Sequence, residues 1–357
     1  MAYTTINKHT DYFDTTLITG NGSTQNITGL GFQPDFIWMK RRNATGHNRL
    51  IDAVRGSSKI IQSDLSNAEG TDTTYVSSFN SDGWSIGSNS DVNASGGTAV
   101  GWSWKANGAG SANTDGSTNS TVSVNSTSGF SIVKWTGTGS GTTIGHGLGV
   151  KPKIIFVKNV SSARNWVVNI GEIMGADERS LYLNANDAIK NDAAADHGYT
   201  YNNTTSLFST ASGSGGTQDD VNKSGDTIIA YCFAEKTGFS KGFKWTGNNN
   251  ADGPFIYCGF APKFVIWKST SSAHSWIIED EARNINGNGY LNGANTRELY
   301  PSAANAEATS GPRFDFYSNG LKIRDSSSAD INGSNAFIGY AFGQSLVGSN
   351  NVPCTAR

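Results

Sequence analysis

The chain has 357 residues, and its 27 Lys and Arg against 29 Asp and Glu give a net charge of −2. Without a basic tract it offers no electrostatic footprint for nucleic acid, and without 18 consecutive apolar residues it has no candidate membrane helix. The first ten residues lack the apolar run of a secretory signal. We therefore expect a soluble protein, made in the cytoplasm, that neither binds nucleic acid nor inserts into a membrane.

Only 16% of the residues are charged, and 43 glycines stand among many Asn, Ser and Thr. This composition is typical of short strands joined by frequent turns. The three cysteines are an odd number without metal-ligand spacing, so we expect free thiols. The length suits two or three domains of about 100–200 residues each.

The first predicted repeat covers residues 1–105. After a Thr-Gly turn at 19–20, residues 34–40 form an apolar segment that begins with proline and ends with lysine. Four consecutive apolar residues predict a strand buried on both faces of its sheet. Near the end of the repeat, a block of the form Asp-x-Asn-x-Ser at 91–95 precedes the apolar segment 98–104, which predicts the closing strand. Residues 106–128, mostly Gly, Ser, Asn, Thr and Ala, predict a flexible linker.

The same landmarks return at 129–237 and at 238–345. The segments from proline to lysine are 152–158 and 262–268, and the Asp-x-Asn-x-Ser blocks are 220–224 and 330–334. Trp166 and Trp276 each stand fourteen residues after the proline, where the first copy has Asn48, and we expect both to be core residues. We predict an all-β protein of three tandem β-sandwich repeats, of the jelly-roll or lectin-like kind, followed by a C-terminal tail at 346–357.

Two Asp–Arg pairs occupy identical offsets from their prolines: Asp52 with Arg55, and Asp280 with Arg283. A carboxylate beside a guanidinium offers both acceptors and donors to a polar ligand such as a sugar, whereas the alternative is an ion pair that closes its own loop. With Glu69 and Glu307, the aspartates also suggest the two acids of a glycoside hydrolase. The second copy has Ile170 in place of the aspartate, so we expect no enzymatic activity and no catalytic residue.

Two other groups of residues are candidates for binding. Asp220, Asn222 and Asp226 suggest an oxygen-ligand loop for Ca²⁺, whereas the alternative is an Asx turn that leads into the closing strand; we expect no other cofactor. Aromatic rings with polar neighbours can stack on sugar faces. The aromatic candidates are Trp84, Tyr75, Tyr199, Tyr201 and Tyr290.

Several segments resemble a domain family of virion proteins from tailed bacteriophages, often described as tail-fibre or structural proteins. They are residues 52–56, 67–69, 81–84, 91–97, 149–153 and 231–235. The resemblance covers nearly the whole chain and implies a lectin-like or SPRY-like β-sandwich without a known catalytic site. It also implies a virion location, at the tail rather than the head, with other virion proteins as partners and a homo-oligomer, trimeric in tail fibres.

We therefore predict a non-enzymatic virion structural protein, a tail-fibre or adhesion component that contacts a host-surface glycan or partner virion proteins. One alternative is a capsid decoration or head-fibre protein that grips neighbouring capsomers. The other is a polysaccharide depolymerase that uses the acidic pairs.

Overall fold

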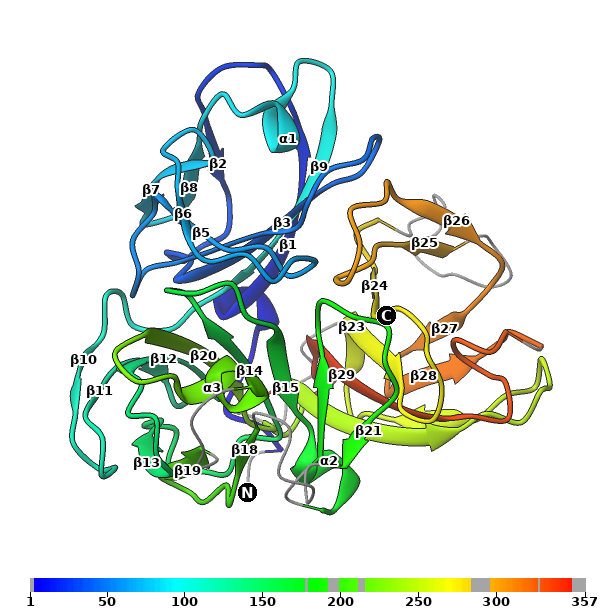
Figure 1. Cartoon of the computed structure of the whole chain (residues 1–357). Helices are drawn as coiled ribbons and strands as arrows, with labels where there is room; N and C mark the ends of the chain where they lie inside the picture. The colour runs from blue at the N-terminus through cyan, green and yellow to red at the C-terminus, as the bar shows by residue number, and fades with distance from the viewer. Residues whose placement is uncertain are drawn as a thin grey trace.

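The chain is all-β, as predicted, and its sheets are antiparallel. A computed structural model describes residues 3–176, 179–191, 199–210, 216–283, 296–326 and 328–348. Figure 1 shows three groups of strands around a common centre, which we call lobe 1 (residues 13–104), lobe 2 (111–233) and lobe 3 (240–344). No helix in the described part of the chain is long and apolar enough to cross a membrane.

The same four-stranded arrangement occurs in each lobe: the opening strand, the closing strand, the proline-led strand and the strand that follows it. In lobe 1 the order is β1 (Phe13–Thr19), β9 (Thr98–Trp104), β3 (Phe36–Arg41) and β4 (Arg49–Asp52). In lobe 2 it is β12 (Phe130–Thr136), β20 (Thr227–Phe233), β14 (Ile154–Asn159) and β15 (Trp166–Asn169), inside an eight-stranded sheet. In lobe 3 it is β21 (Ser240–Thr246), β29 (Ala336–Gln344), β23 (Ala261–Ser269) and β24 (Ile277–Asp280).

A three-stranded sheet accompanies each of these arrangements. The three sheets are β2 (Gln25–Thr28), β8 (Gly83–Ile86) and β7 (Val76–Asn80); β13 (Thr142–Gly145), β19 (Leu207–Thr210) and β18 (Thr200–Tyr201); and β22 (Phe255–Tyr257), β28 (Gly320–Ile323) and β27 (Phe314–Tyr317). Within a lobe, side chains of both sheets form one apolar cluster, as Ile37 and Met39 do with Trp84 and Ile86 in lobe 1.

Further short elements complete the fold. The strands are β5 (Lys59–Ile60), β6 (Gly70–Thr71), β16 (Arg179–Tyr182), β17 (Lys190–Asn191), β25 (Thr296–Glu298) and β26 (Ala308–Ser310). Two of them, β16 and β17, extend the lobe 2 sheet beyond β15. The helical turns are η1 (His9–Asp11), α1 (Ser90–Asn93), α2 (Gly171–Met174), η2 (Gly216–Gln218) and α3 (Asp219–Asn222). The Ala-rich stretch 302–309 contains no helix and leads into β26.

The prediction of a flexible linker at 106–128 is wrong. Residues in this range form β10 (Ser111–Asn113) and β11 (Ser120–Asn125), which extend the lobe 2 sheet beyond β12. In β11, Val122 and Val124 alternate with polar residues, and Val122 is buried in the apolar cluster of lobe 2. This two-residue period is the signature of a strand, and the surrounding low-complexity composition concealed it.

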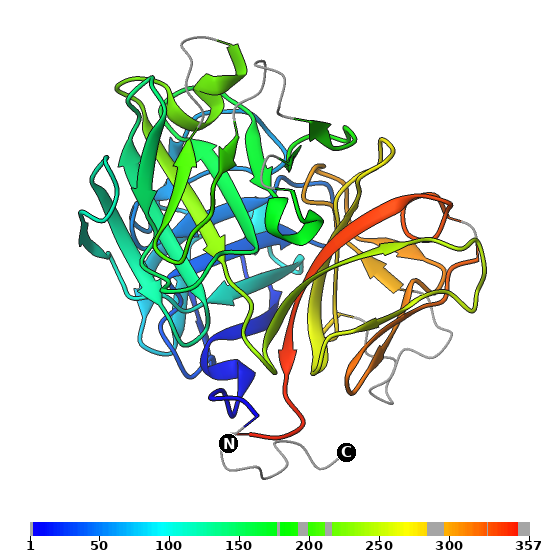
Figure 2. The same ribbon diagram turned by 90° about the horizontal axis from the view of Figure 1, so that it is seen from below.

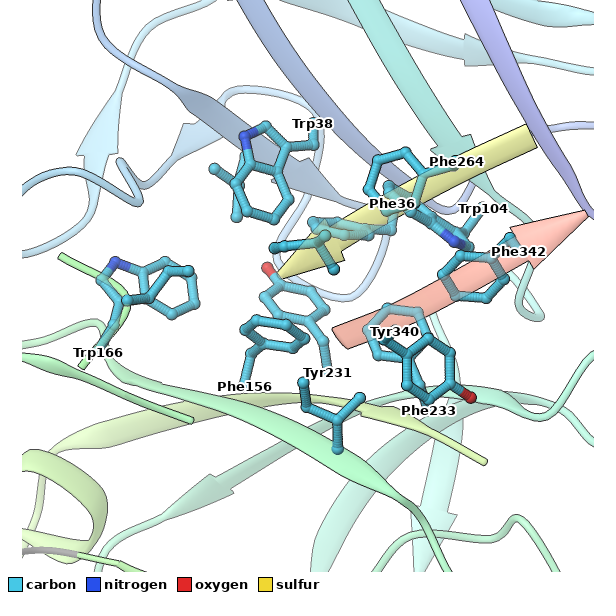
Figure 3. A pocket seen from close by; sticks show the side chains of 14 residues that line it. Phe36, Trp38, Trp104, Phe156, Trp166, Tyr231, Phe233, Phe264, Tyr340 and Phe342 are labelled. Atoms are coloured by element: carbon cyan, nitrogen blue, oxygen red, sulfur yellow. The ribbon is translucent and has the colours of Figure 1, made fainter. Parts of the chain in front are cut away.

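The three four-stranded sheets share one central core. Because side chains alternate along a strand, Ile37 and Met39 face the cluster inside lobe 1, whereas Phe36 and Trp38 face the centre of the molecule. Figure 3 shows aromatic side chains of all three lobes gathered there, among them Phe156 and Phe264. The proline-led strands are therefore buried on both faces, as predicted, but the lobes are not separate modules.

The two ends of the ring of lobes are joined by hydrogen bonds. The backbone nitrogen of His9 donates to Gln344 Oε1 over 2.9 Å, and Gln344 Nε2 donates to the carbonyl oxygen of Asn7 over 3.0 Å. In Figure 2 the N-terminal segment accordingly lies beside the end of β29, drawn in red. The N-terminal residues thus hold lobe 3 against lobe 1.

Candidate functional site

A buried lysine at the end of each proline-led strand bonds to a backbone carbonyl of another lobe. The bonds are Lys40 Nζ to Ala304 O (3.0 Å), Lys158 Nζ to Ser66 O (3.0 Å) and Lys268 Nζ to Asn186 O (3.1 Å). They run from lobe 1 to lobe 3, from lobe 2 to lobe 1 and from lobe 3 to lobe 2, so they form a closed ring. Burial lowers the pKa of each lysine to about 8, because removal from water disfavours the charged form.

The residue fourteen positions after each proline makes a second ring of contacts. The bonds are Trp166 Nε1 to Gln62 O (2.7 Å), Trp276 Nε1 to Tyr182 O (2.9 Å) and Asn48 Nδ2 to Tyr300 O (3.0 Å). The prediction that both tryptophans are core residues is confirmed, since neither exposes measurable surface. Asn48 makes the equivalent bond with its side-chain amide. The sequence comparison, which showed only that asparagine replaces tryptophan here, did not predict this bond.

The Asp52–Arg55 pair lies in the contact between lobe 1 and lobe 2. Arg55 bonds Asp52 through Nε (2.5 Å) and Glu69 through Nη1 (3.1 Å), and the Tyr231 hydroxyl of lobe 2 donates to Asp52 Oδ2 over 2.7 Å. The side chains of Asp52 and Arg55 are 0% and 2% exposed. Burial and the neighbouring Asp52 raise the pKa of Tyr231 well above its usual value, so its hydroxyl remains a donor.

The Asp280–Arg283 pair repeats this arrangement between lobe 3 and lobe 1. Arg283 bonds Asp280 (2.6 Å) and Glu307 (3.2 Å), and Trp102 Nε1 of lobe 1 donates to Asp280 Oδ2 over 2.9 Å. Asp280 and Arg283 are fully buried side chains. The prediction of a ligand site at the two Asp–Arg pairs therefore needs correction, because both pairs bind other lobes and present no exposed group to a ligand.

The equivalent positions of lobe 2 are apolar. At the offsets of Asp52 and Arg55, lobe 2 has Ile170 and Ile173, both buried in the central core. At the structural position of Glu69 it has Ile189, whose backbone nitrogen bonds Thr270 O as that of Glu69 bonds Val160 O. In lobe 2, three isoleucines thus stand at the positions of the aspartate, the arginine and the glutamate of lobe 1.

The asparagine of each Asp-x-Asn-x-Ser block holds the turn after the opening strand. Its Oδ1 accepts from the backbone nitrogen that follows the Thr-Gly turn: Asn93 from Asn21, Asn222 from Thr138 and Asn332 from Asn248, each at 3.0 Å. Glycine is required in that turn, because a Cβ on Gly137 would lie 2.1 Å from Lys223 O. The blocks thus act as structural clamps, in line with the alternative of a turn before the closing strand.

The candidate calcium ligands bond to separate protein groups. Asp220 Oδ1 accepts from Asn165 N, Asn222 Nδ2 donates to Ser140 O, and Asp226 Oδ2 accepts from Asn159 Nδ2. Burial raises the pKa of Asp220 to about 6, which does not favour a charged metal ligand. Within the described residues no group of three or more His, Cys, Asp or Glu is placed to hold a metal ion.

The predicted aromatic candidates have different locations. Trp84 is fully buried in the cluster of lobe 1, and Tyr75 is buried with its hydroxyl donating to Asp91 Oδ2 over 2.8 Å. Neither ring is exposed to a glycan, so the prediction is wrong for these two residues. Tyr199 and Tyr201 are partly exposed, with ring centroids 5.4 Å apart. Tyr290 lies outside the described residues.

The centre of the molecule encloses a small cavity (Figure 3). It measures about 20 Å³ and is lined by apolar and aromatic side chains of all three lobes, including Trp38, Trp166 and Phe342. A cavity of this size holds about one water molecule, and a buried water needs polar partners. The cavity is therefore a packing defect rather than a ligand site.

Three exposed aromatic side chains lie on the outside of the three-stranded sheet of lobe 3. Six large apolar side chains of the described residues are exposed, and three of them are Phe255 (47%), Tyr257 (56%) and Tyr317 (37%). We call these three residues the aromatic face. Phe255 and Tyr317 have ring centroids 6.1 Å apart, and both Tyr257 and Tyr317 pair with Gly320 of the middle strand β28.

A family model described as "Domain of unknown function (DUF7483)" matches residues 8–345. The chain belongs to this family. Neither the curated proteins nor the solved structures contain a match. The matched region spans all three lobes without interruption, as expected for a chain whose lobes share one core.

Sequence reasoning missed the aromatic face, although the signal was present. Phe255 and Tyr257 alternate with the buried Ile256, which indicates a strand with an outward aromatic edge. The equivalent positions in lobe 1 are Asn26 and Thr28, since Ile27 pairs with Trp84 as Ile256 pairs with Leu321. Alignment of these two copies would therefore have shown that lobe 3 has aromatic residues where lobe 1 has polar ones.

Proposed function

We propose that the chain is a non-enzymatic virion structural protein, a tail-fibre or adhesion component in which three β-sandwich repeats are fused around one core. Its partners are a host-surface glycan and other virion proteins. The observation that carries this proposal is the aromatic face, an exposed set of three rings on one side of lobe 3. Exposed aromatic side chains are typical of recognition surfaces.

The buried acidic pairs support a structural rather than a hydrolytic role. A glycosidase needs two carboxyl groups that flank a substrate bond, whereas Asp52 and Asp280 are enclosed between lobes and bonded to arginine. This arrangement gives no support to a polysaccharide depolymerase. One four-stranded arrangement also occurs three times within this chain, so a threefold repeat of the fold does not require three chains.

The proposal is tested on intact particles and on host cells. Immunogold labelling should place the chain on the tail, and a signal confined to the capsid would contradict the tail location. The purified protein should adsorb to host envelopes without releasing reducing ends from their polysaccharide. Release of reducing ends that is abolished by Asp280→Asn would contradict the non-enzymatic assignment.

A further inference from the structure

We propose that the aromatic face binds a polysaccharide chain across strands β22, β28 and β27, and that Lys241 selects sugars carrying a carboxylate. This inference rests on the proposed function and names the site and the ligand class. It begins with the direction of the side chains. In the three-stranded sheet of lobe 3, Ile256, Phe316 and Leu321 point into the lobe, so their neighbours point outward.

Gly320 of the middle strand contributes no side chain between Tyr257 and Tyr317. Tyr257 and Tyr317 lie on either side of Gly320, and the Phe255 ring lies over this glycine: a Cβ added there would be 3.0 Å from Phe255 Cζ. The added Cβ would also lie 2.2 Å from Ile256 O. The glycine thus leaves the space between the two tyrosines open to the Phe255 ring.

Charged side chains contact the two tyrosines of the face. Lys241 Nζ lies 5.1 Å from the Tyr257 ring centroid and donates to Tyr257 O over 2.8 Å. Arg324 Nη2 donates to the Tyr317 hydroxyl over 3.0 Å, while Arg324 Nε bonds Asp315. Rings that are already ordered lose little conformational entropy on binding, so the face is prepared for a ligand.

The surroundings of the face favour a sugar over a protein partner. The centre of a protein–protein interface is depleted of charged residues. Here charged side chains stand directly beside the rings, with Lys322 facing Phe255 in the strand pairing and bonded to Asp252. A pyranose matches this mixture, because its C–H face stacks on an aromatic ring and its hydroxyls bond to charged groups.

Lys241 adds a preference for acidic sugars. Lys322 forms an ion pair with Asp252, and Arg324 forms one with Asp315. Lys241 forms no ion pair with any described residue; it contacts Tyr257 through one hydrogen bond and through the ring. A carboxylate on the bound chain can form a charge-assisted hydrogen bond with this ammonium group.

The first copy of the fold supplies the test variant. Replacing the three rings by the residues at equivalent positions of lobe 1 gives Phe255→Asn, Tyr257→Thr and Tyr317→Asn, which keeps strand residues that the same type of sheet already accommodates. The matched control is Leu17→Thr, which removes a side chain 47% exposed in lobe 1, away from the face. Unchanged melting temperatures would show that both variants fold.

Binding is measured by affinity electrophoresis in alginate, a polymer of uronic acids, and in hydroxyethylcellulose, a neutral glucan. We expect retardation in both gels and stronger retardation in alginate, at least tenfold weaker binding by the triple variant, and no change for Leu17→Thr. Lys241→Met should abolish the preference for alginate. No retardation in either gel, or equal retardation of the triple variant, would overturn the proposed site.

Adsorption to host envelopes separates failure of this site from failure of the proposed function. If the triple variant adsorbs as well as the wild-type protein, the site is wrong while the adhesion function stands. If the wild-type protein does not adsorb, the adhesion function itself is wrong.

Discussion

The contact that lobe 2 makes through Ile170 and Ile173 differs in chemistry from the equivalent contacts of lobes 1 and 3. At the same offsets from the proline, lobes 1 and 3 use a buried Asp–Arg pair, which a glutamate completes, and lobe 2 uses isoleucines. The backbone bond beside each contact is retained, as in Glu69 N to Val160 O and Ile189 N to Thr270 O. The backbone bond and the buried lysine are thus common to all three contacts, whereas the side-chain chemistry between the lobes differs.

The polar contacts and the apolar contact differ in which neighbouring side chains they accept. A buried charge without its partner is strongly unfavourable, so Asp52 requires a donor such as the Tyr231 hydroxyl from the facing lobe. An isoleucine accepts any apolar neighbour of suitable volume. We infer that the ion pairs specify which lobe packs against which, whereas the isoleucines contribute packing alone.

Removing one member of a polar contact should have the largest effect. Among the described residues, Asp280→Ala leaves the fully buried Arg283 with only Glu307 as a counter-charge. We expect the free energy of unfolding to fall by about 3–5 kcal/mol, measured by urea denaturation. Ile170→Val at the equivalent position of lobe 2 is the matched control, with an expected loss of about 1 kcal/mol. Equal losses for the two variants would contradict the distinction between the contacts.

Converting a polar contact into the apolar form should be tolerated. The variant Asp52→Ile, Arg55→Ile, Glu69→Ile and Tyr231→Phe copies the isoleucines of lobe 2 and removes the hydroxyl that would lose its acceptor. Replacement of a buried ion pair by apolar residues is often neutral or stabilising by about 1–4 kcal/mol. We expect unfolding in urea at an equal or higher midpoint, and a clear decrease would show that the ion pair itself stabilises lobe 1.

The hydroxyl groups of the two central tyrosines, Tyr231 and Tyr340, should differ in how much they contribute to stability. Tyr231→Phe removes the donor to the buried Asp52 and should cost about 1–3 kcal/mol. The hydroxyl of Tyr340, the equivalent residue of lobe 3, makes a long 3.5 Å contact with the neutral Ser240 Oγ, so Tyr340→Phe should be nearly neutral. Thermal unfolding of the two variants in parallel measures the difference, and similar losses would mean that the hydroxyl bond to Asp52 contributes little.

The repeated elements of the fold were predictable because each is a local pattern. The apolar residues 36–39 indicated a strand buried on both faces, and its position in the central core confirms this. The pattern could not show what covers the second face. It is covered by the other two lobes rather than by a further sheet of the same repeat, so three separate modules were expected where one shared core exists.

The candidate site was harder to predict because burial depends on tertiary packing. Asp52 and Arg55 have the sequence pattern of a polar surface pair, but in the structure they are buried and bond to Tyr231 of lobe 2. Trp84 has polar neighbours in sequence yet is buried between two sheets. Phe255 and Tyr257 were overlooked for the opposite reason, since an apolar residue in a predicted strand is normally assigned to the core.

All three lobes have a buried lysine at the same position. The contribution of each of these lysines to the free energy of unfolding should depend on pH in the same way. Their folded pKa of about 8 is below the ordinary value of 10.5, so between these values the unfolded chain binds more protons and the contribution of each lysine to stability rises with pH. The slope is at most about 1.4 kcal/mol per pH unit for one lysine. The unfolding free energy of the wild type minus that of Lys268→Met should therefore increase from pH 8 to 10.5, and Lys40→Met should show the same increase. A flat difference for one lysine alone would mean that the ring of lysine bonds is not equivalent in the three lobes.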